Sequence, residues 1–274
     1  MKNIEFEKMV ASGNDFVVID NREKTLRASL LGGFAKRMCS RNYGVGADGI
    51  LLIESSKKAD FRMRIINADG SEAEMCGNGA RCIALYAREH KIAGKRMCFE
   101  TLAGVIEAAI SADRIKLRMS VPKDIKTGLS LNLSEGEFNL NFVNTGVPHV
   151  VIFVDHAEEQ DVKKLGKEVR YHSVFAPAGT NVDFVELVGA GTLKVRTYER
   201  GVEAETLACG TGVTASAIIA AAVKGLRSPV TCVTRSGDRL KVYFEKDGND
   251  YKDVYLEGGA RSVFSGRYQT NNRR

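Results

Sequence analysis

The chain has no tryptophan, only four histidines and four prolines, and no two cysteines spaced as C-x-x-C. So few histidines and no paired cysteines argue against a metal site. Lysines and arginines are scattered rather than interleaved with aromatic side chains, so the net charge of +6 does not predict nucleic-acid binding. No segment approaches the roughly 18 apolar residues of a membrane span, and residues 1–20 lack the apolar core of a signal peptide. We therefore expect a cytoplasmic protein with reduced thiols and no metal, nucleic-acid or membrane partner.

A length of 274 residues with 44% hydrophobic content is enough for a sizeable core in one large domain or two medium ones. The 27 glycines and four prolines indicate a compact chain with many turns rather than stiff linkers. One glycine turn, at residues 43–49, is similar to part of a dinucleotide-binding fingerprint. It precedes an expected strand instead of opening a helix, so a nucleotide site is not predicted there.

Two similar stretches of sequence, 133 residues apart, carry the most informative cysteines. Asn67–Arg81 reads NADGSEAEMCGNGAR, and residues 201–215 read GVEAETLACGTGVTA. In both, Glu-Ala-Glu is followed by a cysteine, then by Gly-x-Gly and a run with helical periodicity. The same offset relates Gly13 to Gly146 and Gly104 to Gly237. A repeat of this length indicates a duplicated domain rather than a solenoid unit.

The duplication predicts an α+β fold of two homologous domains, each a curved mixed β-sheet wrapped around a central helix. The second central helix, residues 214–223, consists of small and aliphatic residues, which suits a helix enclosed by a sheet on most sides. We expect an N-terminal domain of residues 1–118, completed by a C-terminal strand at 262–274, and a second domain of residues 119–261. The active site is expected in the cleft between the two domains.

Periodicity and turn residues give the remaining elements. Helices are expected at 25–41, 77–90 and 156–169, and strands on either side of the turn at 11–14. Further strands are expected at 50–54 and 61–66, with a strand, a turn and a strand over 97–118 and irregular chain over 119–131.

Cys76 and Cys209 both stand where a helix is expected to begin. The first turn of a helix offers unpaired N–H groups and a partial positive charge. These groups can bind a carboxylate, and they are expected to lower the pKa of the thiol below its usual value of about 8.5. The other cysteines lie among apolar residues without a glycine turn, so we expect them to be buried and inert; they are Cys39, Cys82, Cys98 and Cys232.

Two thiols facing one bound anion have the chemistry needed to invert a stereocentre. A thiolate on one face removes a proton from carbon, and a thiol on the opposite face returns one. The two helix N-termini would stabilise the negative charge that develops in between. No pyridoxal lysine and no nucleotide loop is visible in the sequence, so we expect no cofactor.

The motif A-D-G-S-E-x-x-x-C-G-N-G-x-R around Cys76 and the Tyr-Glu-Arg…Ala-Cys-Gly-Thr-Gly run around Cys209 are highly specific. With Ser-Gly-Asn-Asp-Phe16 and Gly-x-Pro-His149, they make the chain resemble the diaminopimelate epimerase family from about residue 1 to residue 266. The resemblance implies interconversion of LL- and meso-2,6-diaminopimelate in lysine and peptidoglycan-precursor synthesis. It also implies a homodimer.

The resemblance further implies roles for individual residues. Cys76 and Cys209 would be the acid/base pair, with His149 and Glu199 as the polar pair that steers the reacting amine and the thiols. Backbone amides that bind the reacting carboxylate would come from Gly77, Asn78, Gly210 and Thr211. The distal, non-reacting end of the substrate would be held by Asn14, Asn67, Asn181 and Arg200.

The chemistry of these residue types agrees with a zwitterionic substrate. Arg200 can bind a carboxylate through two hydrogen bonds, and asparagine side chains offer both a donor and an acceptor. Taken alone, Asn14 suits a turn, and His149 suits a packed histidine as well as a catalytic one.

Two positions depart from the family pattern. Val147 stands where many members have Asn, and Gly49 where some have Gln, so the distal pocket is expected to differ here.

Three alternatives remain open. The chain could be another cofactor-independent racemase of the same duplicated fold, such as the proline racemase type, although Arg200 and the asparagines favour a substrate with a second charged end. It could be a redox protein in which Cys76 and Cys209 form a reversible disulfide, which we instead expect to inactivate the enzyme. It could also bind an anion without catalysis.

Overall fold

The structure is a computed structural model that describes residues 2–270 and forms two units. One unit contains the residues up to Leu117 and those from Gly259 onward, and the other is Arg118–Gly258. We keep the sequence-based domain limits, 1–118 with 262–274 and 119–261, as a proposal. The mixed sheets and few helices of both units confirm the α+β fold class.

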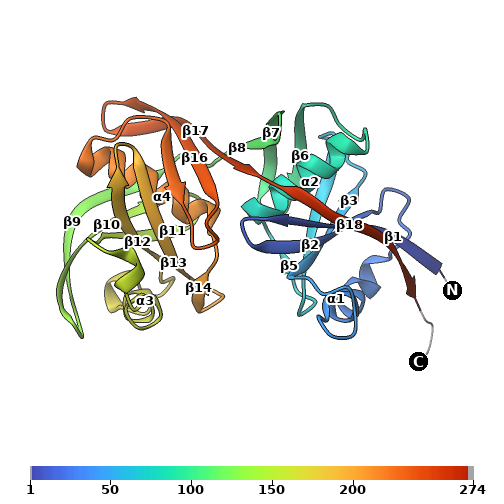
Figure 1. The fold of residues 1–274 in the computed structure, drawn as a ribbon, viewed down its shortest axis with the longest axis horizontal. Helices are drawn as coiled ribbons and strands as arrows, with labels where there is room; N and C mark the ends of the chain where they lie inside the picture. Colours follow the sequence, from blue (N-terminus) through green and yellow to red (C-terminus); the bar gives the residue numbers. More distant parts are fainter. Residues whose placement is uncertain (1, 271–274) are drawn as a thin grey trace. The chain divides into compact units, whose positions relative to one another are not determined.

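The N-terminal unit is built on a mixed sheet in which strands from both ends of the chain meet (Figure 1). Its strands follow the order β18–β1–β2–β3–β4–β6–β7–β8, and β5 pairs with the edge of β4. The pairs β2–β3 and β4–β6 are parallel and the others antiparallel. The strands are β1 (Lys2–Ala11), β2 (Asn14–Asp20), β3 (Gly49–Glu54), β4 (Phe61–Asn67), β5 (Glu72–Ala73), β6 (Arg96–Thr101), β7 (Gly104–Ser111), β8 (Arg114–Arg118) and β18 (Arg261–Thr270). The helices are η1 (Ala28–Leu30), α1 (Leu31–Cys39) and α2 (Gly77–Glu89).

The second unit repeats this arrangement. Its strands follow the order β9–β10–β11–β12–β13–β15–β16–β17, with β14 on β13, and the pairs β11–β12 and β13–β15 are parallel. The strands are β9 (Lys123–Leu133), β10 (Gly136–Asn144), β11 (Pro148–Phe153), β12 (Asn181–Gly189), β13 (Thr192–Glu199), β14 (Ala204–Thr206), β15 (Val230–Val233), β16 (Arg239–Asp247) and β17 (Asp250–Gly259). The helices are η2 (Ala157–Glu159), α3 (Val162–Arg170), η3 (Ser173–Phe175) and α4 (Gly210–Lys224). The matching order of parallel and antiparallel pairs confirms the internal duplication.

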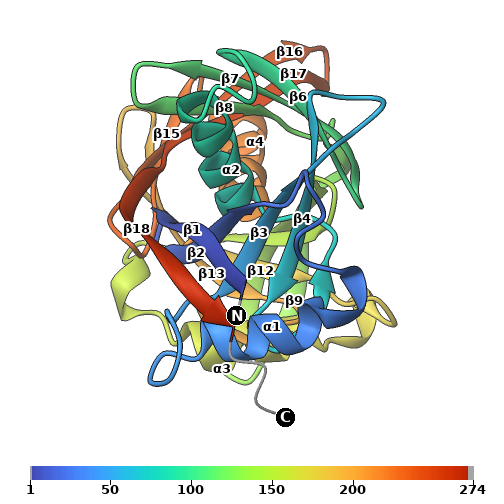
Figure 2. The same ribbon diagram turned by 90° about the vertical axis from the view of Figure 1, so that its right-hand side faces the viewer.

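Each sheet encloses one helix, as the sequence predicts. Helix α2 packs against β1, β2, β3, β4 and β7 (Figure 2), and α4 packs against seven strands of its own unit, from β9 to β16. Every residue from Gly212 to Ala221 is buried. Their small side chains let the strands approach the helix closely from several sides. Gly225, in the left-handed conformation at φ 70°, ends the helix.

Three expected elements need correction. The helix expected at 25–41 is confined to Leu31–Cys39 after a short 3₁₀ turn, because Lys24 has a φ of 54° and the Asn21 side chain bonds the Leu26 backbone. The chain expected to be irregular over 119–131 contains most of β9, whose alternate leucines pack on the core of the second unit. The segment 97–118 holds three strands rather than two. None of the helices within residues 2–270 is long and apolar enough to cross a membrane.

Candidate active site

The two cysteines singled out in the sequence occupy equivalent places in the two units. Cys76 is the N-cap residue of α2 and Cys209 the N-cap residue of α4, both with extended backbones. The Gly79 N–H donates to the Cys76 sulfur at 3.5 Å. The prediction that a helix begins directly after each thiol is confirmed.

A chain of polar contacts leads from the Cys209 thiol into the interior of the second unit. The Cys209 Sγ lies 3.3 Å from Thr211 Oγ1, and that hydroxyl lies 3.0 Å from His149 Nε2. His149 Nδ1 lies 2.7 Å from Asp183 Oδ2. The second carboxylate oxygen, Oδ1, accepts a hydrogen bond of 2.6 Å from the Thr197 hydroxyl. His149 and Asp183 are completely buried, so water does not compete for these contacts.

The expectation of a lowered thiol pKa is wrong for Cys209. Burial raises its pKa, and the nearby carboxylates of Glu199 and Asp183 raise it further; the Thr211 hydroxyl and the Gly212 backbone N–H oppose this effect. The thiol is therefore protonated at rest. The pKa of Glu199 is also raised by burial, with partial opposition from the adjacent Thr206 hydroxyl and from His149.

The remaining predicted residues of the second unit surround His149. Asn181 is buried; its Nδ2 donates to Pro148 O at 3.0 Å and lies 3.4 Å from His149 Nε2, while its Oδ1 accepts from the Arg200 N–H at 2.8 Å. Arg200 Nη1 donates to Ala178 O at 3.1 Å. Gly210 and Thr211 are the first two residues of α4. The unit thus brings His149, Asn181, Arg200 and Thr211 together at this helix end.

In the N-terminal unit, Asn14 and Asn78 lie in one hydrogen-bonded chain. Asn78 Nδ2 donates to Asn14 Oδ1 at 2.6 Å, and Asn14 Nδ2 donates to Asp48 Oδ2 at 2.9 Å. The completely buried Arg81 donates to Asn78 Oδ1 at 2.7 Å. Because each amide has one acceptor and one donor side, these contacts fix which side every amide presents. Asn67 lies apart from this chain, at the end of β4, and donates from Nδ2 to Ser71 Oγ at 3.0 Å.

Two glycines of the N-terminal unit, Gly77 and Gly49, have different physical roles. Gly77 opens α2, and an added Cβ would meet no atom within 4 Å, so packing does not require glycine there. At Gly49, an added Cβ would lie 2.9 Å from Ile66 O. The β3–β4 ladder therefore has no room for a side chain at Gly49. Val147, the other departure, is half-buried, and its carbonyl accepts from Thr145 N–H.

The other cysteines are structural, with one correction. Burial raises the pKa of Cys39 to about 11 and that of Cys82 to about 12, and it also raises the pKa of Cys232. Such thiols stay protonated and unreactive at neutral pH. Cys98 was expected to be buried and is instead half-buried, because it alternates in β6 with the fully buried Phe99.

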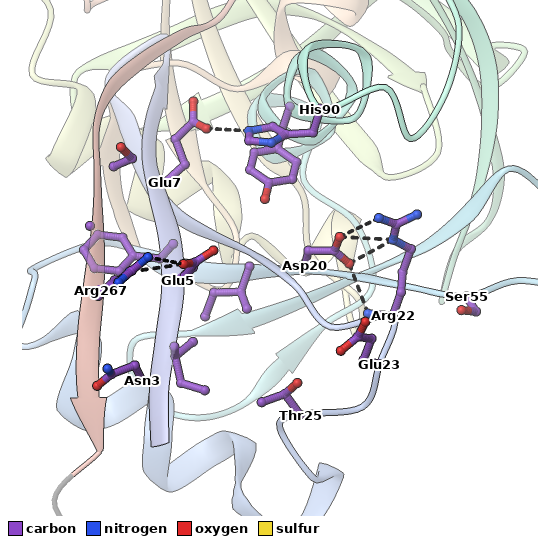
Figure 3. A pocket seen from close by; sticks show the side chains of 16 residues that line it. Asn3, Glu5, Glu7, Asp20, Arg22, Glu23, Thr25, Ser55, His90 and Arg267 are labelled. Atoms are coloured by element: carbon purple, nitrogen blue, oxygen red, sulfur yellow. Dashed lines mark hydrogen bonds and ion pairs between the residues drawn. The ribbon is translucent and has the colours of Figure 1, made fainter. Parts of the chain in front are cut away.

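A hollow of about 980 Å³ lies elsewhere on the N-terminal unit, between β1, β2, β18 and the end of α2 (Figure 3). Its carboxylates are largely paired: Glu7 with His90 at 2.8 Å, Asp20 with Arg22 at 2.7 Å, and Glu5 with Arg267. None of the predicted site residues lines it. Within residues 2–270, no three His, Cys, Asp or Glu side chains are arranged to hold a metal ion.

Sequence reasoning missed three polar residues that the structure connects to the site: Asp183, Asp48 and Arg81. A signal for Asp183 was present. It follows Asn181 by two residues, both lie in β12, and alternate residues of a strand face the same side. For Arg81 the motif was visible, but nothing local shows that a guanidinium is buried.

The comparisons with known proteins agree over most of the chain. The family model described as diaminopimelate epimerase matches residues 6–123 and 141–263. The chain is 46% identical to the diaminopimelate epimerase of Aquifex aeolicus, over 96% of this chain and 97% of that one, and 43% identical to that of Archaeoglobus fulgidus, over 98% and 97%.

Solved structures of lower identity share the fold. A Bacillus anthracis phenazine biosynthesis protein of the PhzF family superposes with a TM-score of 0.78 at 18% identity, covering 98% of this chain and all of that one. A probable proline racemase from Agrobacterium radiobacter gives 0.70 at 13% identity, covering 98% and 93%. With near-complete coverage by the family model and relatives above 40% identity, this chain belongs to the diaminopimelate epimerase family.

Proposed function

We propose that the chain interconverts LL-2,6-diaminopimelate and meso-2,6-diaminopimelate without a cofactor, in lysine and peptidoglycan-precursor synthesis. The observation that carries the proposal is the identity of 46% to a diaminopimelate epimerase over nearly the full length of both chains. A cysteine at the N-cap of each central helix supports it, because the reaction needs a proton acceptor and a proton donor of similar strength.

In the proposed reaction, Cys76 and Cys209 act in turn on one α carbon. The thiolate of one removes the α proton, which leaves a carbanion, and the thiol of the other delivers its own proton to the opposite face. The first cysteine is left protonated and the second as a thiolate, so atoms and charge balance without an oxidant or reductant. The N–H groups of Gly77, Asn78, Gly210 and Thr211 would bind the reacting carboxylate and stabilise its growing charge.

The raised pKa of Cys209 fits this cycle. A thiol that stays protonated at rest can deliver its proton to the carbanion, and the thiolate that it leaves is a strong base for the reverse reaction. His149 and Glu199 would steer the reacting amine and the thiols. Asn14, Asn67, Asn181 and Arg200 would hold the distal end, where Arg200 supplies a cation for the second carboxylate.

Proton exchange in heavy water tests the proposal directly. The protein is incubated with LL-diaminopimelate and, separately, with proline, and deuterium at the α carbon is measured by mass spectrometry. We expect exchange and epimerisation of diaminopimelate only. Exchange of proline alone would instead favour the proline racemase type, and exchange of neither would favour an anion-binding protein.

Single substitutions test the two-thiol scheme. Cys76→Ala and Cys209→Ala should each abolish epimerisation, since each removes the proton donor or acceptor on one face. Near-normal turnover in either variant would contradict the scheme. A redox function is tested by comparing reduced with oxidised protein: oxidation should stop turnover, and equal turnover would remove both cysteines from the acid/base roles.

We also propose a homodimer, on the basis of the family resemblance. Light scattering at working concentration should give about twice the mass of the 29.9 kDa chain.

A further inference from the structure

The His149–Asp183 pair behind Cys209 has no polar equivalent at its matching positions in the N-terminal unit. In the second unit, His149 pairs with Asn181 across the parallel β11–β12 ladder, and Asp183 follows two residues later. In the first unit, Phe16 pairs with Gly49 across the parallel β2–β3 ladder, and Leu51 follows two residues later. Phe16 and Leu51 therefore stand where His149 and Asp183 stand.

The glycine in the first turn of each central helix confirms this equivalence. Gly79 and Gly212 each follow their cysteine by three residues. An added Cβ at Gly79 would meet the side chains of Leu51 at 3.1 Å and Phe16 at 3.5 Å. At Gly212 it would collide with Asp183 Oδ1. The same place in the fold is filled by apolar side chains in one unit and by a carboxylate in the other.

Burying an acid and an imidazole costs free energy that Phe16 and Leu51 do not cost. Phe16 and Leu51 show that the fold can fill this position with side chains whose burial costs less free energy. The acid–imidazole pair of the second unit is therefore explained by chemistry rather than by packing.

On the basis of the proposed function, we infer that Asp183 is a positioning residue. It holds His149 as a proton acceptor for Cys209, and the Thr211 hydroxyl links the imidazole to the thiol. An ionised carboxylate has no proton to donate, so the Asp183 contact requires the proton on His149 Nδ1. His149 Nε2 is then the acceptor that faces Thr211. The Thr211 hydroxyl donates to Nε2, and its oxygen accepts from the Cys209 S–H.

Proton movement along this chain is balanced. The S–H proton of Cys209 passes to Thr211 Oγ1 while the hydroxyl proton of Thr211 passes to His149 Nε2. The products are a thiolate, an unchanged hydroxyl and an imidazolium that faces the Asp183 carboxylate. Asp183 is itself held by the Thr197 hydroxyl and lies beside the first turn of α4, whose partial positive charge stabilises a carboxylate. The reverse movement returns the thiol.

Alkylation of the thiols without substrate tests this inference independently of the substrate assignment. Wild type, Asp183→Asn, Thr211→Val and Thr211→Ser are treated with iodoacetamide at neutral pH, and each cysteine peptide is quantified over time. Cys76 is the internal reference and Cys232 the buried control. We expect Asp183→Asn and Thr211→Val to slow alkylation of Cys209 about tenfold, the effect of one pKa unit on the thiolate fraction, while Thr211→Ser stays near wild type.

Simple electrostatics predicts the opposite sign. If Asp183 acted only as a nearby negative charge, removing that charge would favour the thiolate and speed alkylation of Cys209. Faster or unchanged alkylation in Asp183→Asn would therefore overturn the inference. So would a wild-type Cys209 that reacts no faster than Cys232.

Turnover supplies the second readout. Thr211→Val keeps the backbone N–H and should lower kcat for diaminopimelate about 10²-fold with KM little changed, and Thr211→Ser should restore it. Asp183→Asn should cause no further loss in a His149→Asn background, because it acts through the imidazole. Additive losses would show that Asp183 has a separate structural role. If alkylation behaves as expected and diaminopimelate is not turned over, the proton chain stands and the substrate assignment fails.

Discussion

Arg81 gives the sharpest prediction about stability, because its guanidinium is completely buried and holds the start of α2. It donates to Asn78 Oδ1 at 2.7 Å, Ser12 Oγ at 2.8 Å, Gly259 O at 3.2 Å and Gly77 O at 3.3 Å. Arg81→Met keeps most of the volume and leaves these acceptors without their donor. A buried acceptor that loses its donor costs about 1–3 kcal/mol, so the loss of Arg81 from several acceptors should cost about 3–5 kcal/mol. At roughly 3 °C for each kcal/mol, this corresponds to a decrease in Tm of about 10–15 °C for the transition of the N-terminal unit.

The matched control is Arg22→Met. Arg22 forms a bidentate ion pair with Asp20 near the surface, and such pairs contribute about 0–1 kcal/mol. Calorimetry and urea unfolding of both variants measure the difference directly. A loss in Arg81→Met within 1 kcal/mol of the loss in Arg22→Met would refute the reasoning that the guanidinium network holds this helix end.

Two further predictions concern the second unit and its helix. Glu199→Gln should raise the free energy of unfolding at neutral pH and leave it unchanged below about pH 4, measured by urea unfolding across pH. The sign follows because burial raises the folded-state pKa of Glu199, so the ionised form destabilises the fold and the protonated form does not; an unchanged difference across pH would contradict it. Gly212→Ala should lower Tm, at a cost of about 1–3 kcal/mol, because its Cβ would collide with Asp183 Oδ1. Gly77→Ala, whose Cβ meets open space, is the control and should leave Tm unchanged or slightly higher.

Local signals in the sequence were sufficient to predict the framework of the site. A cysteine before Gly-x-Gly predicts the start of a helix from neighbouring residues alone, and both α2 and α4 begin there. The small residues of α4 likewise predict a helix enclosed on several sides. These features depend on residues within one or two helical turns, which is the range over which sequence patterns are reliable.

Properties that depend on distant residues could not be predicted in the same way. The pKa of Cys209 is raised by burial and by the carboxylates of Glu199 and Asp183, which strand pairing brings near the thiol. The burial of Arg81 depends on Ser12 and Gly259, which are 69 and 178 residues away in the chain. Strand β9 was not predicted because its many polar, outward-facing residues obscure the alternating pattern of leucines, which lie opposite apolar residues of β10. In each case the deciding partner is far away in sequence.

The duplication explains why the same ladder positions hold different chemistry in the two units. Gly49 and Asn67 pair at the end of β3–β4, and the register of β12–β13 places Asn181 and Glu199 at the corresponding end. In a duplicated backbone, strand pairing fixes the direction in which each side chain points. The identity of the side chain at that position can still differ between the two copies. In the first unit Gly49 stands at the position of Asn181, where an added Cβ would lie 2.9 Å from Ile66 O, and Asn67 offers a neutral amide where the second unit has a carboxylate. The shared backbone thus gives the two cysteines equivalent places at the start of α2 and α4, while the side chains at the matching ladder positions around them differ in polarity.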